Sequence, residues 1–362
     1  MNKRQKKKII RTATSVAKKN PTLFIILALI FVAIAVAGYF YYNSRKKDAG
    51  STFTLENAPA VTEGTLDVHI LELGNDNPGD CSYINANGYD ILIDAGSKAS
   101  SKNTIVSYLK EYVKDGVIEF VILTHADADH IACFGISGGI FDEFKCGTVI
   151  DSPITNKADN SGYKSYREKL ENEIATEGAK HYTALECCNE VNGAKKVYDF
   201  GNGVSMEILY NYFYEHETSS ENNYSVCAQF HHGERRFLFT GDLEIEGEEK
   251  LVESNDLKQV LFYKAGHHGS STSSNECLLS VVKPVLCAVN CVAGGQYGFP
   301  TKIFLSRIQV YTKLVFVTRE VGDKLLNGNI VVKSNTDGVK VLCSNNDKVI
   351  SETDWYKTNR SA

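Results

Sequence analysis

One short segment constrains this chain more than any other. The apolar run Val117–Leu123 is followed at once by Thr124-His125-Ala126-Asp127-Ala128-Asp129-His130. A short apolar run of this kind is typical of a strand that is buried on both faces. Two imidazoles and two carboxylates fall within six consecutive residues just after the strand. Burying them together is costly unless a cation neutralises the carboxylates. The segment therefore predicts a metal site where this strand ends.

Strand and helix patterns alternate along most of the chain. Apolar alternation or short apolar runs predict strands at 66–73, 82–85, 90–94, 117–123, 204–209, 225–231, 236–240, 285–289, 314–318 and 328–334. Apolar residues at helical spacing predict helices at 102–114, 165–175, 275–282 and 301–308. Runs of strands interspersed with helices favour stacked sheets with helices outside. We expect one domain over residues 64–335, a linker at 43–63 and a polar C-terminal tail at 336–362.

The N-terminal region carries a different signal. Residues 22–42 contain no charged side chain, and roughly 20 apolar residues suffice for a helix to cross a bilayer. Eight Lys and Arg precede this stretch and three follow it, which predicts that the basic segment 1–21 stays in the cytoplasm. We expect a single-pass signal anchor in the cell membrane, with the main domain extracellular. The alternative is a cleaved secretory signal, with Ala35-Val36-Ala37 as the cleavage motif.

Charge and cysteine content narrow the possible functions. The first 47 residues hold 11 of the 39 basic side chains and none of the 44 acidic ones, so the remainder holds 28 against 44, a net charge of −16. This balance argues against a broad basic face for nucleic acid, although it leaves room for a local groove. The ten cysteines form no repeated CxxC pattern, and we interpret them as small buried residues or free thiols.

Three further segments carry polar groups at the ends of predicted strands. Gly241-Asp242 follows one apolar strand, and His267-His268 lies in a loop flanked by glycines. Gly79-Asp80-Cys81 and Asp94-Ala95-Gly96 are tight turns, which are either simple turn chemistry or part of a site. Each of these signals is weak alone, but together with residues 124–130 they indicate one polar centre.

Taken in this order, the motifs resemble the metallo-β-lactamase superfamily. More closely, they resemble the hydrolase domain of ComEC-type competence proteins and its stand-alone relatives. The similar stretches lie between about residues 65 and 334 and read GDCSYI, YDILIDAG, ILTHADADH, ENNYS, FLFTGDLE, YKAGHHGSSTSS, QYGFP and NGNI. The resemblance implies an α/β fold, a metallo-β-lactamase-like αββα sandwich with its metal site at the sheet edges, here preceded by one N-terminal transmembrane helix.

The resemblance also implies a site for two divalent metal ions, Zn or Mn. His125 and Asp127 would bind the first ion, while Asp129 and His130 would bind the second. His267 or His268 would join the second ion, with His267 as our assignment, and Asp242 would bridge the two. We expect catalytic roles for Asp129, for Lys264 as a phosphate clamp and for His268 as a proton donor to the leaving group.

Two positions depart from the family pattern. Many superfamily members have a third protein ligand, a His, on the first metal, and it has no clear counterpart here, His216 being the nearest candidate. The family's Tyr-Gly-His-Pro is Tyr297-Gly298-Phe299-Pro300, so a His that contacts substrate in relatives is replaced by Phe299.

The sequence thus predicts a membrane-anchored, metal-dependent hydrolase. We expect a phosphodiesterase that acts on DNA or another phosphodiester through metal-activated water. Two alternatives stay open: a carbonyl hydrolase such as a lactonase or β-lactamase, and a degenerate, non-catalytic binding module. A shared fold does not decide between these functions.

Overall fold

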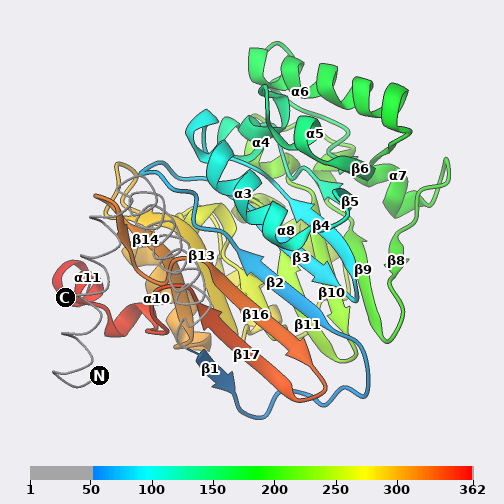
Figure 1. Cartoon of the computed structure of the whole chain (residues 1–362). Helices are drawn as coiled ribbons and strands as arrows, with labels where there is room; N and C mark the ends of the chain where they lie inside the picture. The colour runs from blue at the N-terminus through cyan, green and yellow to red at the C-terminus, as the bar shows by residue number, and fades with distance from the viewer. Residues whose placement is uncertain (1–51, 361–362) are drawn as a thin grey trace, which may run out of the picture. The chain divides into compact units, whose positions relative to one another are not determined.

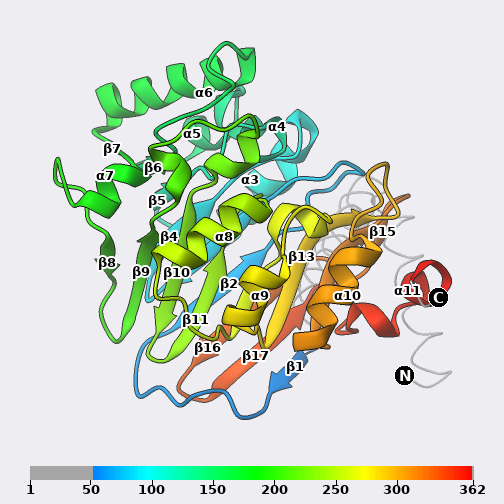
Figure 2. The same ribbon diagram turned by 180° about the vertical axis from the view of Figure 1, so that it is seen from behind.

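Two sheets pack face to face in residues 52–360, the part of the chain that the computed structural model describes. Helices cover the outer side of each sheet (Figures 1 and 2). This arrangement confirms the predicted αββα sandwich. The predicted basic segment 1–21 and membrane helix 22–42 lie outside the described residues. Among the helices of residues 52–360, none combines the length and the apolar character needed to cross a membrane.

The first sheet has nine strands in the order β1-β17-β16-β2-β3-β4-β5-β6-β7. Strands β4 to β7 are parallel, so their carboxyl ends meet at one edge. The strands are β1 (Thr52–Leu55), β2 (Leu66–Ile70), β3 (Ser82–Ala86), β4 (Tyr89–Ile93), β5 (Val117–Ile122), β6 (Lys145–Asp151), β7 (Lys180–Thr183), β16 (Ile330–Asn335) and β17 (Gly338–Cys343).

The second sheet has eight strands in the order β15-β14-β13-β12-β11-β10-β9-β8. Strands β11 to β14 are parallel, so this sheet also gathers several carboxyl ends at one edge. The strands are β8 (Val197–Asp199), β9 (Val204–Leu209), β10 (Cys227–His232), β11 (Arg235–Phe239), β12 (Phe262–Lys264), β13 (Leu286–Ala293), β14 (Val315–Glu320) and β15 (Lys324–Leu325).

Three apolar layers hold the sandwich together. The central layer joins the two sheets, and each outer layer joins one sheet to its helices. Figure 1 shows α3 to α6 on the first sheet, and Figure 2 shows α8, α9 and α10 on the second. The helices are α3 (Lys102–Tyr112), α4 (Ala128–Gly135), α5 (Ile140–Glu143), α6 (Ser161–Asn172), α7 (Ala184–Asn189), α8 (Ile245–Ser254), α9 (Glu276–Val282), α10 (Lys302–Tyr311) and α11 (Asp354–Asn359).

Strand β4 illustrates why these sequences form covered strands. Side chains alternate between the two faces of a strand. Ile91 and Ile93 therefore enter the central layer, while Leu92 enters the layer beneath the helices of the first sheet. All three side chains are almost completely buried, so an unbroken apolar run is satisfied on both faces.

The first sheet extends beyond the expected limits of 64 and 335. Strand β1 lies in the segment that we took as linker and pairs with β17, which lies in the expected polar tail. Val339, Val341 and Cys343 alternate with more exposed residues and complete the central layer. The residues around this strand are mostly lysine, asparagine and aspartate, so the tail as a whole reads as polar and its short alternating pattern is easily missed.

All ten cysteines lie within residues 52–360 and are free thiols. Eight of them are buried, which agrees with their interpretation as small apolar side chains.

Candidate metal centre

The expected ligands converge where the carboxyl ends of the two sheets meet. The first sheet supplies His125, in the loop after β5, and Asp129 and His130, in the first turn of α4. The second sheet supplies Asp242 after β11 and the His267-His268 pair after β12. Backbone bonds join the two sheets here, since the amide of Val226 donates to the carbonyl of Thr124 at 2.8 Å.

Asp94 fixes the orientation of His130. The carboxylate of Asp94 accepts hydrogen bonds from the amide and the hydroxyl of Thr124, at 2.8 and 2.7 Å. Its Oδ2 also lies 2.7 Å from Nδ1 of His130. Because Nδ1 is engaged, Nε2 of His130 faces the centre, 3.2 Å from Oδ2 of Asp242. The Asp94-Ala95-Gly96 turn is therefore part of the site.

The backbone of Asp129 is held equally closely. The carbonyl of Asp129 accepts a hydrogen bond from the amide of Asp80 at 3.0 Å. The carbonyl of the next residue, His130, accepts one from the amide of Ala95 at 2.8 Å. A Cβ on Gly96 would lie 1.8 Å from the carbonyl oxygen of Asp129. A residue without a side chain is thus required for the first turn of α4 to approach this loop.

Asp242 lies between three imidazoles. Its Oδ2 is 3.2 Å from Nε2 of His130, 3.4 Å from Nε2 of His268 and 3.8 Å from Nε2 of His267. Nε2 of His268 also lies 3.4 Å from Oδ2 of Asp129. The predicted bridging position of Asp242 is consistent with these distances.

Five buried polar atoms at this centre form no hydrogen bond, although four of them lie 3.2–3.7 Å from an ion-pair partner. They are Asp80 Oδ1, His125 Nε2, His130 Nε2, Asp242 Oδ1 and His268 Nε2. Leaving such atoms without hydrogen bonds is expensive, so their convergence calls for a bound group. The ligand atoms of His125, His130 and Asp242 lie within 4.8 Å of one another, and so do those of Asp129, His130 and His268. Nitrogen and carboxylate donors at this spacing fit divalent metal ions.

The pKa values of the imidazoles at this centre also favour a bound cation. Burial lowers the pKa of His125. Burial also opposes the charged forms of His130 and His268. Asp242 and the neighbouring carboxylates outweigh this effect, so the pKa of His130 is raised well above its usual value and that of His268 to about 10. The carboxylates thus favour positive charge in this space, which a metal ion supplies with the imidazoles neutral.

The two adjacent histidines have different surroundings. His268 is buried, and its Nδ1 lies 3.1 Å from the carbonyl oxygen of Asn290, which directs Nε2 at the centre. His267 is 22% exposed, and its Nδ1 lies 3.0 Å from the hydroxyl of Thr272. Both residues have a positive φ, 47° and 52°, which turns the two rings in ways that the sequence does not reveal. His268, rather than His267, belongs to the clustered ligand atoms.

Asp127 lies at the rim of the centre. Its Oδ2 is 3.7 Å from Nε2 of His125, while its Oδ1 is 2.8 Å from Nζ of Lys157. Lys157 belongs to the loop between β6 and α6. Glu221 joins this loop to residues 124–130, which we call the metal loop. The carboxylate of Glu221 accepts bonds from the amide of Ala126 at 3.0 Å and the amide of Asn156 at 2.6 Å. Sequence reasoning missed Lys157 and Glu221 because only the fold brings them here.

Lys264 occupies an unexpected position. Its side chain is 4% exposed, and Nζ donates to Oδ2 of Asp80 at 2.8 Å. Oδ1 of Asp80 in turn lies 3.2 Å from Nδ1 of His268. This buried ammonium holds Asp80 behind His268 and does not face solvent, where a phosphate clamp would have to lie.

The other five histidines have partners elsewhere. His216 stacks on Tyr212 at 3.7 Å between ring centroids and lies away from the ligand cluster, so it is not brought to the centre. Near His125 the structure instead places Ser225, whose hydroxyl lies 3.4 Å from Nδ1 of that ring. The remaining histidines contact polar groups outside the cluster: His69, His181, His231 and His232.

Comparison with known proteins finds one family model that matches part of the chain. Residues 74–177, which include the metal loop, match the model of the metallo-beta-lactamase superfamily. The metallo-beta-lactamase fold protein YhfI from Bacillus subtilis is 12% identical, with a TM-score of 0.41 over 70% of this chain and 97% of that one.

Two curated bacterial proteins are similar over a longer stretch. Recombination protein 2 of Haemophilus influenzae is 26% identical over 280 residues, which are 76% of this chain and 30% of that protein. Competence protein ComA of Neisseria gonorrhoeae is 27% identical over 257 residues, 70% of this chain and 31% of that protein. The chain thus spans less than a third of the length of these relatives. Residues 74–177 thus match the model of the metallo-beta-lactamase superfamily, and the longer stretch is similar to bacterial competence proteins.

Proposed function

We propose that this chain is a metal-dependent phosphodiesterase that acts on DNA or another phosphodiester. The observation that carries the proposal is the set of five buried polar atoms without a hydrogen bond at the seam of the two sheets. Such atoms are costly to desolvate without a bound cation, which argues against a degenerate module that binds no metal.

In this proposal two divalent ions are held by His125, His130 and Asp242 on one side and by Asp129, His268 and Asp242 on the other. The mixture of imidazole nitrogen and carboxylate oxygen suits Zn²⁺ and also admits Mn²⁺. When bound, such ions lower the pKa of a water molecule to near neutrality and polarise the phosphorus centre. His268 replaces His267 as the proposed ligand because its Nε2 is buried and aimed at the centre.

The chain's own residues would position the substrate. Lys157 offers a 37% exposed ammonium beside Asp127, at the rim of the centre, where it can bind a phosphate oxygen. His267 is partly exposed and lies 3.8 Å from Asp242, so it is placed to protonate the leaving oxygen. A cation at the entrance favours a phosphodiester over a neutral lactam or lactone.

The proposed location is the outer face of the cell membrane, held by residues 22–42. The support is the uncharged stretch itself and the larger number of basic residues before it. Protease added to intact cells should remove the hydrolase domain and leave the basic N-terminus protected. Protection of the whole chain would place the domain on the cytoplasmic side.

The activity is tested on the full chain, purified in mild detergent. Metal content is measured after dialysis against Zn²⁺ or Mn²⁺, and hydrolysis is followed on single-stranded DNA, double-stranded DNA and bis-p-nitrophenyl phosphate. The Asp129→Ala variant removes a proposed ligand. Asp256→Ala is the matched control, since Asp256 is exposed and pairs only with Lys258 in the described structure. Two bound ions and hydrolysis lost only in Asp129→Ala would support the proposal, whereas a metal-free or inactive wild-type protein would overturn it.

A further inference from the structure

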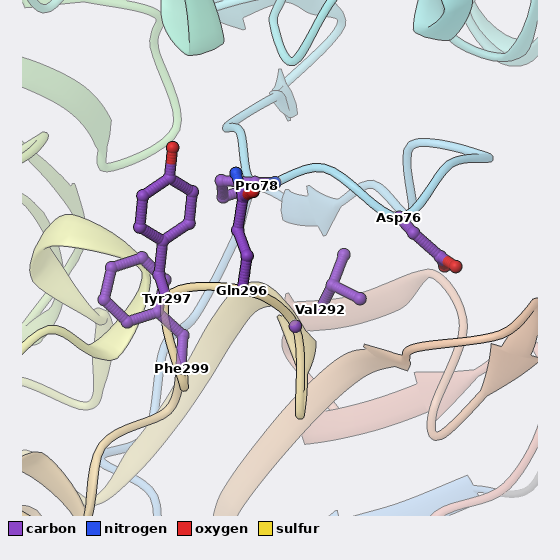
Figure 3. A pocket seen from close by; sticks show the side chains of 7 residues that line it. Asp76, Pro78, Val292, Gln296, Tyr297 and Phe299 are labelled. Carbon is purple, nitrogen blue, oxygen red and sulfur yellow. The ribbon is translucent and has the colours of Figure 1, made fainter.

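A shallow pocket lies beside the metal centre, on the loop between β13 and α10. Figure 3 shows Tyr297 and Phe299 as the aromatic part of its rim, with Pro78 and Gln296 close by. The residues that line it are Asp76, Pro78, Val292, Gly295, Gln296, Tyr297 and Phe299. Nothing in the proposed metal chemistry uses this pocket.

The two aromatic rings form a continuous path to the candidate ligands. The ring of Tyr297 stacks on that of Phe299, with centroids 5.7 Å apart and an interplanar angle of 21°. The ring of Phe299 lies 5.8 Å from that of His267 and 5.9 Å from that of His268. These are ordinary spacings for interacting aromatic pairs. A planar group placed on Tyr297 would therefore lie two rings away from the metal centre.

A backbone bond joins the aromatic loop to the histidine loop, since the amide of Thr301 donates to the carbonyl of Gly269 at 2.9 Å. The guanidinium of Arg360 holds the aromatic loop from the other side by donating to the carbonyl of Gly298 at 2.9 Å. Gly269 directly follows His268 and has φ +81°, and a Cβ there would lie 2.9 Å from Pro300. The aromatic loop and the His268 loop are thus in direct contact.

Tyr297 keeps an open face. It is 58% exposed, the largest exposed fraction of any tyrosine in residues 52–360, while Phe299 behind it is half-buried. A tyrosine supported by a second ring presents a rigid, planar apolar surface with little conformational freedom to lose. Such surfaces bind unpaired nucleobases by stacking and tolerate any base, because every base has a π face.

We propose that Tyr297 and Phe299 form a stacking subsite for an unpaired nucleobase of the strand whose phosphodiester lies at the metal centre. The subsite rests on the proposed function and narrows its substrate class to single-stranded or frayed DNA. Bases inside a duplex are covered on both faces and would have to unstack before they reached Tyr297. Stacking does not depend on basic charge, which agrees with a main domain that is acidic in total.

The test compares two fluorescently labelled strands of equal length and charge, one of thymidylates and one of abasic tetrahydrofuran units. The quantity measured is kcat/KM on the thymidylate strand divided by kcat/KM on the abasic strand, for the full chain with its metal. We expect this ratio to fall about five- to 150-fold in Tyr297→Leu, the range that loss of one base–aromatic stack allows. Tyr297→Phe keeps the ring and should keep the ratio.

Tyr89→Leu is the matched control. Tyr89 is also an exposed tyrosine, at 42%, and packs on a phenylalanine, Phe200, with ring centroids 5.0 Å apart. It lies at the start of β4, whereas Asp94 and the metal centre follow the end of that strand. The ratio should be unchanged in this variant. A Tyr297→Leu ratio equal to that of the wild type would overturn the subsite, including the case in which both strands are cleaved more slowly by the same factor.

Failure of the proposed function is recognised separately. A wild-type protein that cleaves neither strand would contradict the phosphodiesterase, and the subsite would then be judged from binding alone. Fluorescence anisotropy of the same two strands gives the thymidylate preference in the Asp129→Ala background. Loss of that preference with Tyr297→Leu would support the subsite, and equal binding of both strands by the parent would overturn it.

Discussion

The Oδ2 atom of Asp94 lies 2.7 Å from Nδ1 of His130, and this contact aims Nε2 of the same ring at Asp242. A carboxylate behind a metal-binding histidine fixes the tautomer of the ring and increases its basicity. Asp94 is held in turn by Thr124, the residue that precedes the metal loop. The orientation of the central imidazole therefore depends on a contact between the ends of β4 and β5.

Asp94→Asn should weaken metal binding about 10- to 100-fold, the usual effect of losing such a supporting carboxylate. The measurement is a metal titration of the purified full chain against a competing chelator. Asp151→Asn is the control, because Asp151 contacts Nε2 of His181 at 2.8 Å in a pair that belongs to no ligand cluster. Equal metal affinity in Asp94→Asn and the wild type would show that Asp94 does not orient a ligand.

Chelation should lower the thermal unfolding temperature of the protein. Without a cation, Asp242 is buried among imidazoles that must carry protons to compensate its charge. A ligand that binds only the folded state stabilises it by about 2.7 kcal/mol at a concentration of 100 times its Kd. Melting curves with EDTA, and then with Zn²⁺ or Mn²⁺ restored, test this expectation. Identical curves under all conditions would be incompatible with a metal centre at the seam.

Lys157→Gln should raise the KM for a phosphodiester about tenfold, because one charge-assisted contact to phosphate is lost. Metal content should stay at the wild-type level, which separates substrate binding from any effect through Asp127. Lys102→Gln serves as the control, since Lys102 donates to the carbonyl of Ser137 on the exposed surface. The assignment of Lys157 fails if its variant and the control give the same KM.

Glu248 should make stability depend on pH. Burial raises the pKa of this carboxyl from 4.5 to about 7, although it accepts hydrogen bonds from the amides of Ser274 and Asn275. Because the folded-state pKa is the higher one, the folded protein binds more protons between these values. Stability is therefore fully present below pH 4.5 and falls as pH rises through 7.

The size of this effect is about 3 kcal/mol, from 1.36 kcal/mol per pKa unit. Urea unfolding of Glu248→Gln and the wild type, measured from pH 4.5 to 8, isolates it. The difference in the free energy of unfolding should move in favour of Glu248→Gln as pH rises. Glu253→Gln, on the exposed side of the same helix, controls for the substitution itself. A difference that does not change with pH would contradict the prediction.

The sequence was a good guide to the sandwich and to the metal loop. The apolar run of β5 and the polar residues that follow it are local signals. The structure has a strand at this run, and parallel pairing brings its carboxyl end to the same edge as those of β4 and β6. Short β-strands at the ends of the domain were harder to find. Strand β17 contains only three buried apolar residues, which alternate with Lys340 and the partly exposed Leu342, so its pattern is weak.

The parts of the site that escaped prediction depend on contacts between distant segments. The choice between His267 and His268 follows from two consecutive left-handed backbone conformations, which sequence periodicity does not encode. The sequence predicts a phosphate clamp at Lys264, but Asp80, 184 residues earlier, holds its ammonium inside the protein. Lys157 reaches the rim because Glu221 anchors its loop, again through a contact between remote residues.

The candidate ligands come from both sheets, His125, Asp129 and His130 from one and Asp242 and His268 from the other. Each of the two proposed ions would have ligands from both sheets, so separating the sheets would mean breaking metal–ligand bonds. Opening of one half would then require opening of the other. Native-state hydrogen exchange should consequently slow in β5 and β11 together when metal is added, so that one small site sets the cooperativity of the whole domain.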